Sequence, residues 1–517
     1  MDALTRILAA IAPGWAASRV AGQARLAAEQ ARLNAAQRLY EATKITAQRP
    51  RRGGPQAADA VMDGTRGSMR EFARHLDENC DLAIGVLDDL VTNIIGAGAG
   101  IEPLAVRGPN REPATDLNRQ LADLWAEFWL SPEVTGELSG PEVERLLCRS
   151  WLRDGEVFAQ HVIAPIAPYA TRVPYALELL ESDFLPYDLT RPDSRVTHGV
   201  QKDGWNRPVG YWFSKVHPGN QTFNLQSSEL VWKPADSIMH LKFVRRLHQT
   251  RGVSIFHGVL TRLDDLKDYE ESERIAARVA AALTAYIRRD IGLAAETVVA
   301  GEDSETTSVR TFAMEPGLVF DGLLPGEDVG TIDSKRPNPN LEQFRNAMLR
   351  AVAAGTGTRF SSIAKNYNGT YSAQRQELVE AVTHYRRLFD YLRARFYLPV
   401  WKRFVDASRL AGLVRIPAGV DQMSIYRPEV RPPNMPWIDP LKEIKAYQGM
   451  VESGFRSRHQ VIRDLGSDPA TVDAQLEADP LDIRPAPKQV EMMGPVAAPK
   501  TPDEENKDNQ DELEEAA

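Results

Sequence analysis

The chain has 517 residues, 43% hydrophobic and 26% charged, which is typical of a folded protein with several cores and too polar for a membrane-embedded one. Its net charge of −9 is concentrated at the C-terminus, where residues 502–517 hold eight acids and one lysine. The rest of the chain is almost neutral, which argues against tight binding of nucleic acid by wholesale phosphate neutralisation.

The first 50 residues predict a helical arm. The apolar start superficially resembles a signal peptide, but Asp2 opposes the usual positive start and Pro13-Gly14 ends the apolar run early, so we expect an interfacial or partner-docking helix. Residues 15–49 are rich in Ala, Arg and Gln with few bulky apolar side chains, and should pack on another surface rather than fold alone. A Pro/Gly/Arg-rich linker follows at residues 48–55.

Three helices are expected next. Apolar residues recur with a helical period over 69–95 and again over 115–130. Ser139-Gly140-Pro141-Glu142 has the capping-box form that begins a helix. Cys80 and Cys148 lie within these apolar patterns, so each is expected to be a buried free thiol, which implies a reducing compartment.

From Gly155 the pattern changes to short aromatic and β-branched segments separated by Pro, Gly, Asp and Asn. We expect these segments to form a largely antiparallel sheet. The predicted strands are Glu156–Ile163, Tyr175–Glu181, Val209–Phe213, Glu229–Lys233 and Ile238–Phe243.

Helical patterning returns at Gly252 and continues without proline to Arg289. A helix of that length would span about 57 Å at ~1.5 Å per residue. Its apolar stretch from Ile275 to Ile287 is interrupted by Arg278 and is too short to cross a membrane. No other stretch comes closer to a membrane span.

Residues 291–339 form an island between two helical segments, because Asn340–Ala354 resumes the helical period. Turn residues, including Pro325-Gly326-Glu327-Asp328, divide the island into short segments. The possible strands are Thr297–Ala300, Val309–Met314 and Leu318–Leu324.

Gly355–Ser372 is polar, small and turn-rich, which predicts a mobile loop. Ala373–Leu398 has the strongest helical pattern in the chain, and Pro399 is expected to end that helix. A last helical pair is predicted at Pro440–Glu452 and Arg458–Leu465. From about Pro480 the composition turns to proline and then to acids, which predicts disorder.

Motifs for several kinds of chemistry are missing from the sequence. There is no Gly-x-x-x-x-Gly-Lys-Ser/Thr, no His-Glu-x-x-His and no Gly-x-Ser-x-Gly. The acid pairs Asp88/Asp89, Asp264/Asp265 and Glu270/Glu271 are adjacent in helical segments, so their side chains point about 100° apart, and solvated faces or cross-subunit ion pairs explain them better than catalysis. We therefore expect no catalytic residue, no metal site and no cofactor.

The order of several segments resembles that of lambda-like tailed-phage portal proteins, the head-to-tail connector family. The resemblance covers roughly residues 11–480. One departure is Thr370-Tyr371-Ser372-Ala373, where relatives favour Asn-Tyr-Ser-Ser. The segments that carry the resemblance include Asp154-Gly155-Glu156, Asn206-Arg207-Pro208-Val209-Gly210-Tyr211-Trp212, Arg251-Gly252-Val253-Ser254, Tyr371-Ser372-Ala373-Gln374-Arg375 and Pro436-Trp437-Ile438-Asp439-Pro440.

The resemblance implies an α+β, mainly helical portal-type subunit that forms a ring. Its parts would be an N-terminal helical arm (1–50), a β-rich wing domain with an antiparallel sheet (51–250), a stem helix (251–290), a small α/β clip (291–339), a second stem helix (340–354), a tunnel loop (355–372), a long wing helix and its return (373–420), a C-terminal crown-side region (421–480) and a disordered acidic tail (481–517).

The resemblance also implies a function without chemistry. Portal subunits form a homo-oligomeric ring, usually of twelve copies, at one capsid vertex of the virion after assembly in the host cytoplasm. Double-stranded DNA is packaged through the ring by the terminase and is later ejected through it. The implied partners are the duplex, the terminase large subunit, the major capsid and scaffold proteins and the neck or adaptor proteins, with no membrane.

Within the tunnel loop, Arg359 and Lys365 are the only two bases. We expect them nearest the duplex as weak phosphate contacts, with Asn366 and Tyr367 beside them. Alternatively, the two bases pair with acids of neighbouring subunits or face water.

Three other functions fit the order of segments less well. A ring-forming neck or adaptor protein would usually be much shorter and would lack this order of segments. An enzyme with an unrecognised carboxylate site would need a compact cleft, and a turnover assay would detect it. A host scaffold protein of similar domain make-up would be distinguished by whether neighbouring genes encode a terminase large subunit and a head protease.

Overall fold

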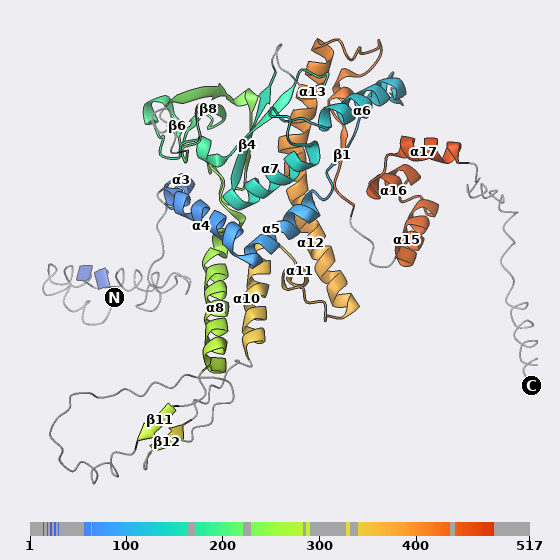
Figure 1. The fold of residues 1–517 in the computed structure, drawn as a ribbon. Helices are drawn as coiled ribbons and strands as arrows, with labels where there is room; N and C mark the ends of the chain where they lie inside the picture. The colour runs from blue at the N-terminus through green and yellow to red at the C-terminus, as the bar shows by residue number, and fades with distance from the viewer. Residues whose placement is uncertain are drawn as a thin grey trace, which may run out of the picture.

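A computed structural model of the chain describes residues 14, 18, 21–22, 25–26, 29, 56–63, 65–163, 171–220, 229–282, 286–289, 327–330, 340–434 and 440–479. The expected acidic tail, most of the N-terminal arm and the three strands predicted within residues 297–324 lie outside the described residues. The described part mixes helices and sheets and is mainly helical, as expected. Two long helices extend side by side from a larger body, with a pair of short strands near their far ends (Figure 1).

The N-terminal part of the body is helical. Its elements are α3 (Ala58–Met62), α4 (Arg66–Asn79), α5 (Asp81–Ile94), α6 (Thr115–Trp129) and α7 (Gly140–Asp154). The capping box is confirmed, because the Ser139 backbone N–H donates to Glu142 Oε2 over 2.9 Å. The expectation of one helix over 69–95 is wrong, since Cys80 has extended backbone angles and divides it into α4 and α5. Both halves pack on α7, and a straight helix could not follow that bend.

The predicted strands form two antiparallel sheets rather than one. The first has the order β10 (Ile238–Lys242), β4 (Glu156–Val162), β5 (Ala176–Leu180), and the second has the order β6 (Val196–Thr197), β7 (Val200–Lys202), β8 (Pro208–Ser214), β9 (Leu230–Pro234). One face of β4 joins the main core through Val157 and Ala159, while Phe158 packs in a smaller core with Tyr211 and Phe213 of the second sheet. Strand patterns alone do not say which strands share a sheet.

Within the described residues, three short strand pairs complete the sheet structure, and each is antiparallel. They are β1 (Gly100–Glu102) with β13 (Glu429–Arg431), β2 (Val106–Arg107) with β3 (Glu112–Pro113), and β11 (Tyr286–Arg289) with β12 (Glu327–Gly330). Glu327 and Asp328, expected in a turn, therefore lie in a strand.

The long helix expected over 252–289 is shorter at both ends. A 3₁₀ turn at Ile255–Gly258 precedes α8 (Leu260–Ala282), and the chain resumes as strand β11. The start is delayed because Val253 donates its N–H to the Phe243 carbonyl and Gly252 donates to Glu156, which holds this segment against the first sheet. The 23 residues of α8 span about 34 Å instead of 57 Å.

The partner of α8 is α10 (Leu341–Thr356), close to the predicted range. The rings of Tyr269 and Phe344 lie 4.9 Å apart between the two helices, and Arg345 pairs with Glu270 at 2.6 Å.

Pro399 does not end the long C-terminal helix of the body. The chain continues from α12 (Tyr371–Leu392) through a π-helical turn (Arg393–Tyr397) into α13 (Leu398–Leu410). Proline lacks an N–H and its ring clashes with the carbonyl of a regular α-helical turn, and the wider π turn accommodates both effects. The apolar stripe of this helix forms a packing seam, since Tyr385, Phe389, Leu392 and Phe396 are buried, while Leu378 and Val382 nearer its start are half-buried.

The C-terminal region contains α14 (Gln422–Ile425), α15 (Pro440–Glu452), α16 (Arg458–Asp464) and α17 (Pro469–Ala478). The predicted pair corresponds to α15 and α16, but α17 was missed. Its start has a sequence signal, because Asp468 caps the Thr471 N–H at 2.8 Å and proline follows it directly. Among the described helices, none combines the length and apolarity that crossing a membrane requires.

Candidate functional site

The segment expected to be a tunnel loop, residues 355–372, is only partly a loop. Helix α10 continues to Thr356, a short helix α11 occupies Phe360–Ala364, and α12 begins at Tyr371. Figure 1 shows α11 near the base of the body, where α10, α5 and α12 come together. The segment therefore has a defined position on the subunit.

Local chemistry sets the turns of this segment. Gly357 ends α10 with φ +75°, and a Cβ there would meet the ring of His384 at 2.5 Å. Glu377 of α12 accepts the Ser361 N–H at 3.1 Å, at the start of α11. Lys365 closes α11 with φ +50°, and the following Asn366 N–H donates back to the Ser361 carbonyl. Left-handed backbone angles thus end α10 at Gly357 and α11 at Lys365, while Arg359 directly before α11 is extended.

Arg359, one of the two predicted DNA contacts, faces the protein. Its Nη2 atom lies 3.3 Å from Asp89 Oδ1, and the side chains of Arg359 and Asp89 are 24% and 7% exposed. Burial is the largest effect and lowers the pKa of Arg359, but the charges and hydrogen bonds of Asp89 and Tyr385 together raise it above its ordinary value. Neither alternative considered for this base, a neighbouring subunit's acid or water, anticipated an acid of the same subunit.

The other three predicted residues lie together at an exposed corner after α11. Lys365 is exposed, and Tyr367 is 61% exposed. Asn366 is half-buried and accepts the Asn368 N–H at 3.1 Å, while Gln374 donates to the Tyr367 carbonyl at 2.5 Å. Their contact with DNA stays a prediction.

Asp89 is the site residue that the sequence interpretation missed. The sequence predicts solvated faces or cross-subunit ion pairs for both of the adjacent acids Asp88 and Asp89. The structure separates them: Asp88 is 60% exposed and pairs with Arg149 of the same subunit, whereas Asp89 points inward. A signal was available, because Asp89 follows Val86 by three residues on a helix whose Val86 and Leu90 are buried.

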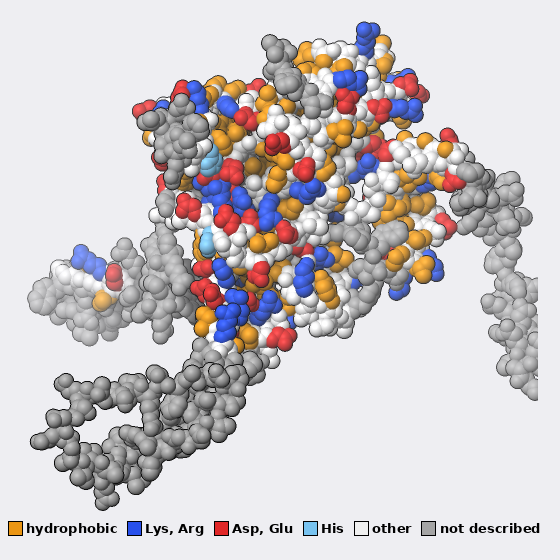
Figure 2. All heavy atoms as spheres, in the orientation of Figure 1, with side chains coloured by type: hydrophobic (Ala, Val, Ile, Leu, Met, Phe, Trp, Pro, Cys, Tyr) orange, Lys and Arg blue, Asp and Glu red, His pale blue; other side chains and the backbone are white. Residues whose placement is uncertain are grey.

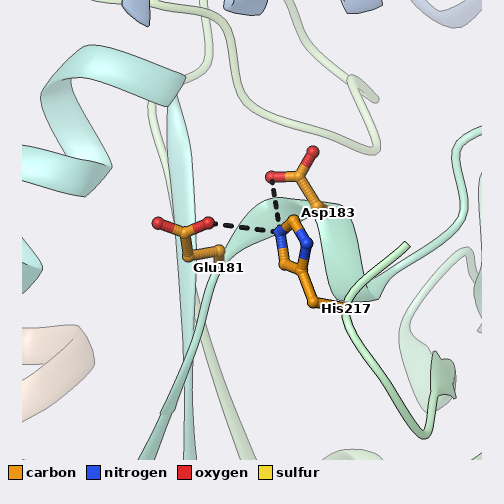
Figure 3. Close-up of side chains that lie close together, drawn as sticks. All are labelled: Glu181, Asp183 and His217. Atoms are coloured by element: carbon orange, nitrogen blue, oxygen red, sulfur yellow. Dashed lines mark ion pairs between the residues drawn. The ribbon is translucent and has the colours of Figure 1, made fainter. Parts of the chain in front are cut away.

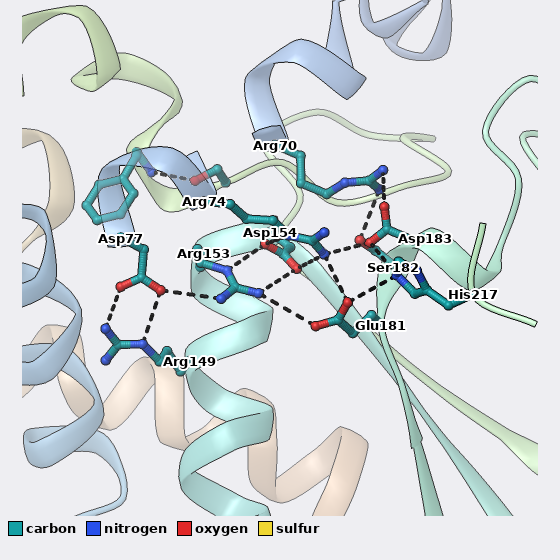
Figure 4. A network of polar contacts seen from close by, with 12 residues as sticks. Arg70, Arg74, Asp77, Arg149, Arg153, Asp154, Glu181, Ser182, Asp183 and His217 are labelled. Carbon is teal, nitrogen blue, oxygen red and sulfur yellow. Dashed lines mark hydrogen bonds and ion pairs between the residues drawn. The ribbon is translucent and has the colours of Figure 1, made fainter. Parts of the chain in front are cut away.

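A second polar cluster joins α4 and α7 to the end of β5 (Figure 4). Arg74 contacts Asp154 at 2.7 Å and Asp183 at 2.6 Å, and Arg153 contacts Asp154 at 2.8 Å. Burial would raise the pKa of Asp154, but hydrogen bonds from Arg153 and Arg74 hold it below its ordinary value. This cluster cross-links the helical and sheet parts of the body.

Glu181, Asp183 and His217 come together at the edge of this cluster (Figure 3). His217 Nε2 lies 3.4 Å from Glu181 and 3.9 Å from Asp183. His217 Nδ1 accepts the Gly219 N–H, so the proton of the neutral ring is on Nε2, facing the acids. Arg70 and Arg74 also contact Asp183. The protonated nitrogen and the two guanidinium groups favour an ion-pair network over a metal centre at these residues.

The charge pattern of the surface is mixed. Figure 2 shows acidic and basic side chains interspersed on the face of the body that it presents. This face has no extended basic surface of the kind that binds nucleic acid tightly.

Comparison with known proteins gives consistent matches. The family model described as "Phage portal protein, lambda family" matches residues 46–388. The chain is 27% identical over 434 residues to a probable portal protein of Halomonas phage phiHAP-1, covering 82% of each protein. It is 21% identical over 421 residues to portal protein B of Escherichia phage lambda, covering 73% of this chain and 76% of that protein.

Among solved structures, a chain from "Virion of native gene transfer agent (GTA) particle" aligns over 78% of this chain and 94% of its own length. Its identity is 15% and the TM-score is 0.42.

Proposed function

This chain belongs to the lambda family of phage portal proteins, and from that premise we propose that it is the portal subunit of a tailed phage. Twelve copies close into a ring at one vertex of the capsid. The terminase packages double-stranded DNA through this ring, the genome leaves through it, and neck or adaptor proteins attach to it. The observation that carries the proposal is the family match over most of the chain.

The architecture supports a division into the parts expected of such a subunit. The two sheets with α4–α7, α12 and α13 form the wing, α8 and α10 the stem, and the region around the β11–β12 pair the clip. The pair lies near the far ends of the two stem helices (Figure 1). Helices α15–α17 contribute to the crown side.

Exposed apolar side chains on the stem support assembly into a ring. Ile275 of α8 and Phe344 of α10 are both exposed in the single subunit. A head-to-tail neighbour in a closed ring would bury such side chains, because each copy presents one face to the next.

The ring acts as a conduit without chemistry of its own, and the force comes from the terminase. Apart from the acidic tail, the chain is almost neutral. Each phosphate that a protein neutralises adds affinity, so a near-neutral conduit holds the moving duplex weakly. The location of the protein is the capsid vertex of the virion.

A packaging assay tests this proposal. Capsid precursors assembled with the chain, and matched precursors assembled without it, are supplied with the phage terminase, ATP and linear DNA. We expect nuclease-protected DNA only in precursors that contain the chain. Equal protection in both preparations would contradict the portal function, and ATP hydrolysis by the purified chain alone would contradict a passive role.

A further inference from the structure

The carboxylate of Asp89 is the point where three helices meet. Tyr385 of α12 donates its hydroxyl to Oδ2 at 2.8 Å, and Ser362 of α11 donates its hydroxyl to Oδ1. Arg359 Nη2 lies 3.3 Å from Oδ1, and Asn93 of α5 itself donates to the same oxygen at 3.2 Å. Four donors thus converge on one buried acid.

The negative charge of the Asp89 carboxylate is compensated by Arg359. Among the described residues, Arg359 is the one cation paired with Asp89. An acid that is 7% exposed is largely removed from water, so losing its cation leaves a poorly compensated charge. Burial, followed by the charge of Asp89, raises the pKa of the Tyr385 phenol, so this group remains a neutral donor.

Helix α11 is held in position by contacts with the rest of the subunit, such as those to Asp89. It has five residues, far fewer than a helix needs for stability on its own. Its other attachments include the buried Ile363, with Phe360 and Ala364 packed against the main core, and the hydrogen bond from Ser361 to Glu377. The guanidinium of Arg350 also lies 5.0 Å over the Phe360 ring. Asp89 contacts both the residue before α11 and a residue within it.

We propose that Asp89 is a positioning residue that anchors α11 and, through it, the exposed corner at Lys365–Tyr367. Arg359 serves as the counter-ion of Asp89 within the subunit rather than as a DNA contact. Lys365 is then the one base of the segment available to a phosphate. The inference rests on the proposed function and on the expectation that residues 355–372 are the tunnel loop of that ring.

Amide hydrogen exchange without DNA tests the anchor directly. The reporters are the Ile363 N–H, bonded to the Arg359 carbonyl, and the Asn366 N–H, bonded to the Ser361 carbonyl. For Asp89→Asn we expect both amides to exchange about 100-fold faster, because the buried ion pair is lost. The matched control is Asp88→Asn, which removes an exposed acid on the same helix and should leave both rates unchanged. Unchanged rates in Asp89→Asn would overturn the proposal.

A second pair of variants keeps the test decisive if Asp89→Asn does not fold. Arg359→Gln should accelerate the same two amides, and Tyr385→Phe, which removes one neutral donor, should do so by about tenfold. If neither variant changes the exchange rates, Asp89 is not an anchor.

Packaging then separates the anchor from a DNA contact. If Arg359 contacts DNA, Arg359→Gln alters DNA packaging while the two amides of the DNA-free protein exchange at the parent rate. If Arg359 is instead part of the anchor, both amides exchange faster in the DNA-free protein. Ring formation, scored by electron microscopy of the same variants, reports on the proposed function independently. Parent protein that forms no ring would refute the portal assignment without affecting the exchange result.

Discussion

The buried pair of Arg251 and Glu156 allows a quantitative test of what holds the wing to the start of the stem. The two side chains are 1% and 0% exposed. Arg251 donates to Glu156 at 2.8 Å and to the carbonyl oxygens of Leu185, His198 and Ser182 at 2.8 to 3.1 Å. It therefore joins the first sheet, the turns after β5 and the segment that leads into α8.

Replacing Arg251 with Met keeps much of the side-chain volume and removes the charge. Glu156 is then buried without its guanidinium partner, which costs about 3–5 kcal/mol in other buried pairs. Three carbonyl oxygens also lose a donor, but each can be satisfied by water if the site opens. We expect Arg251→Met to lower the free energy of unfolding by about 4 kcal/mol.

Urea unfolding, followed by the fluorescence of the nine tryptophans, measures this change. The protein should be kept at a concentration where it is monomeric, because assembly would add to apparent stability. The matched control is Arg207→Met, which breaks an exposed pair with Asp203 and should leave the midpoint unchanged.

The double variant Arg251→Met/Glu156→Gln separates charge from packing. It contains no unpaired buried charge, so it should recover at least half of the loss. A loss below about 1 kcal/mol in Arg251→Met, or a double variant as unstable as the single one, would refute the reasoning.

Three further outcomes follow from buried groups. Gly252→Ala places a Cβ 1.8 Å from a backbone oxygen, so the soluble yield should fall sharply, whereas Gly258→Ala, with open space around it, should express normally. Burial raises the pKa of Glu144 to about 7, so this acid contributes stability that is fully present below pH 4.5 and is lost as pH rises through 7. The free energy of unfolding of Glu144→Gln, measured in urea, should therefore exceed that of the parent by about 3 kcal/mol at pH 8 and equal it near pH 4.5. Burial also raises the pKa of Cys80 and Cys148, so neither thiol should react with a thiol reagent until the protein is unfolded.

Much of the fold follows from local patterns in the sequence. The capping box at Ser139 and the apolar seam through Tyr385 and Phe389 act within one helix, and the predicted strands within residues 156–243 have the expected alternation or β-branched content. Such features depend on residues a few positions apart, so they can be predicted from the sequence alone.

The differences arise where distant segments decide the structure. The break at Cys80 follows from packing on α7, and the passage through Pro399 requires a π turn that no local pattern announces. Strand β11 replaces the end of the expected long helix because its partner lies at Glu327–Gly330, 38 positions beyond Arg289 at the nearest register pair. Helical and strand patterns are ambiguous over such short apolar runs.

The sequence predicts the candidate site only in part, because one of its contacts joins segments that are far apart in the chain. The composition of residues 355–372 located the segment and its two bases, and the structure places Lys365, Asn366 and Tyr367 together at one corner. The ion pair of Arg359 could not be inferred, because Asp89 lies 270 residues away in the sequence. A partner at that distance is set by the packing of α5 against α11 and α12.

The most direct test of the account is electron microscopy of the purified chain. Class averages and a reconstruction should show a twelve-fold ring with an open axial channel, the stem helices α8 and α10 packed around it and residues 355–372 facing the axis. Particles that remain single subunits at every salt and protein concentration, or assemblies without an axial opening, would contradict the portal assignment.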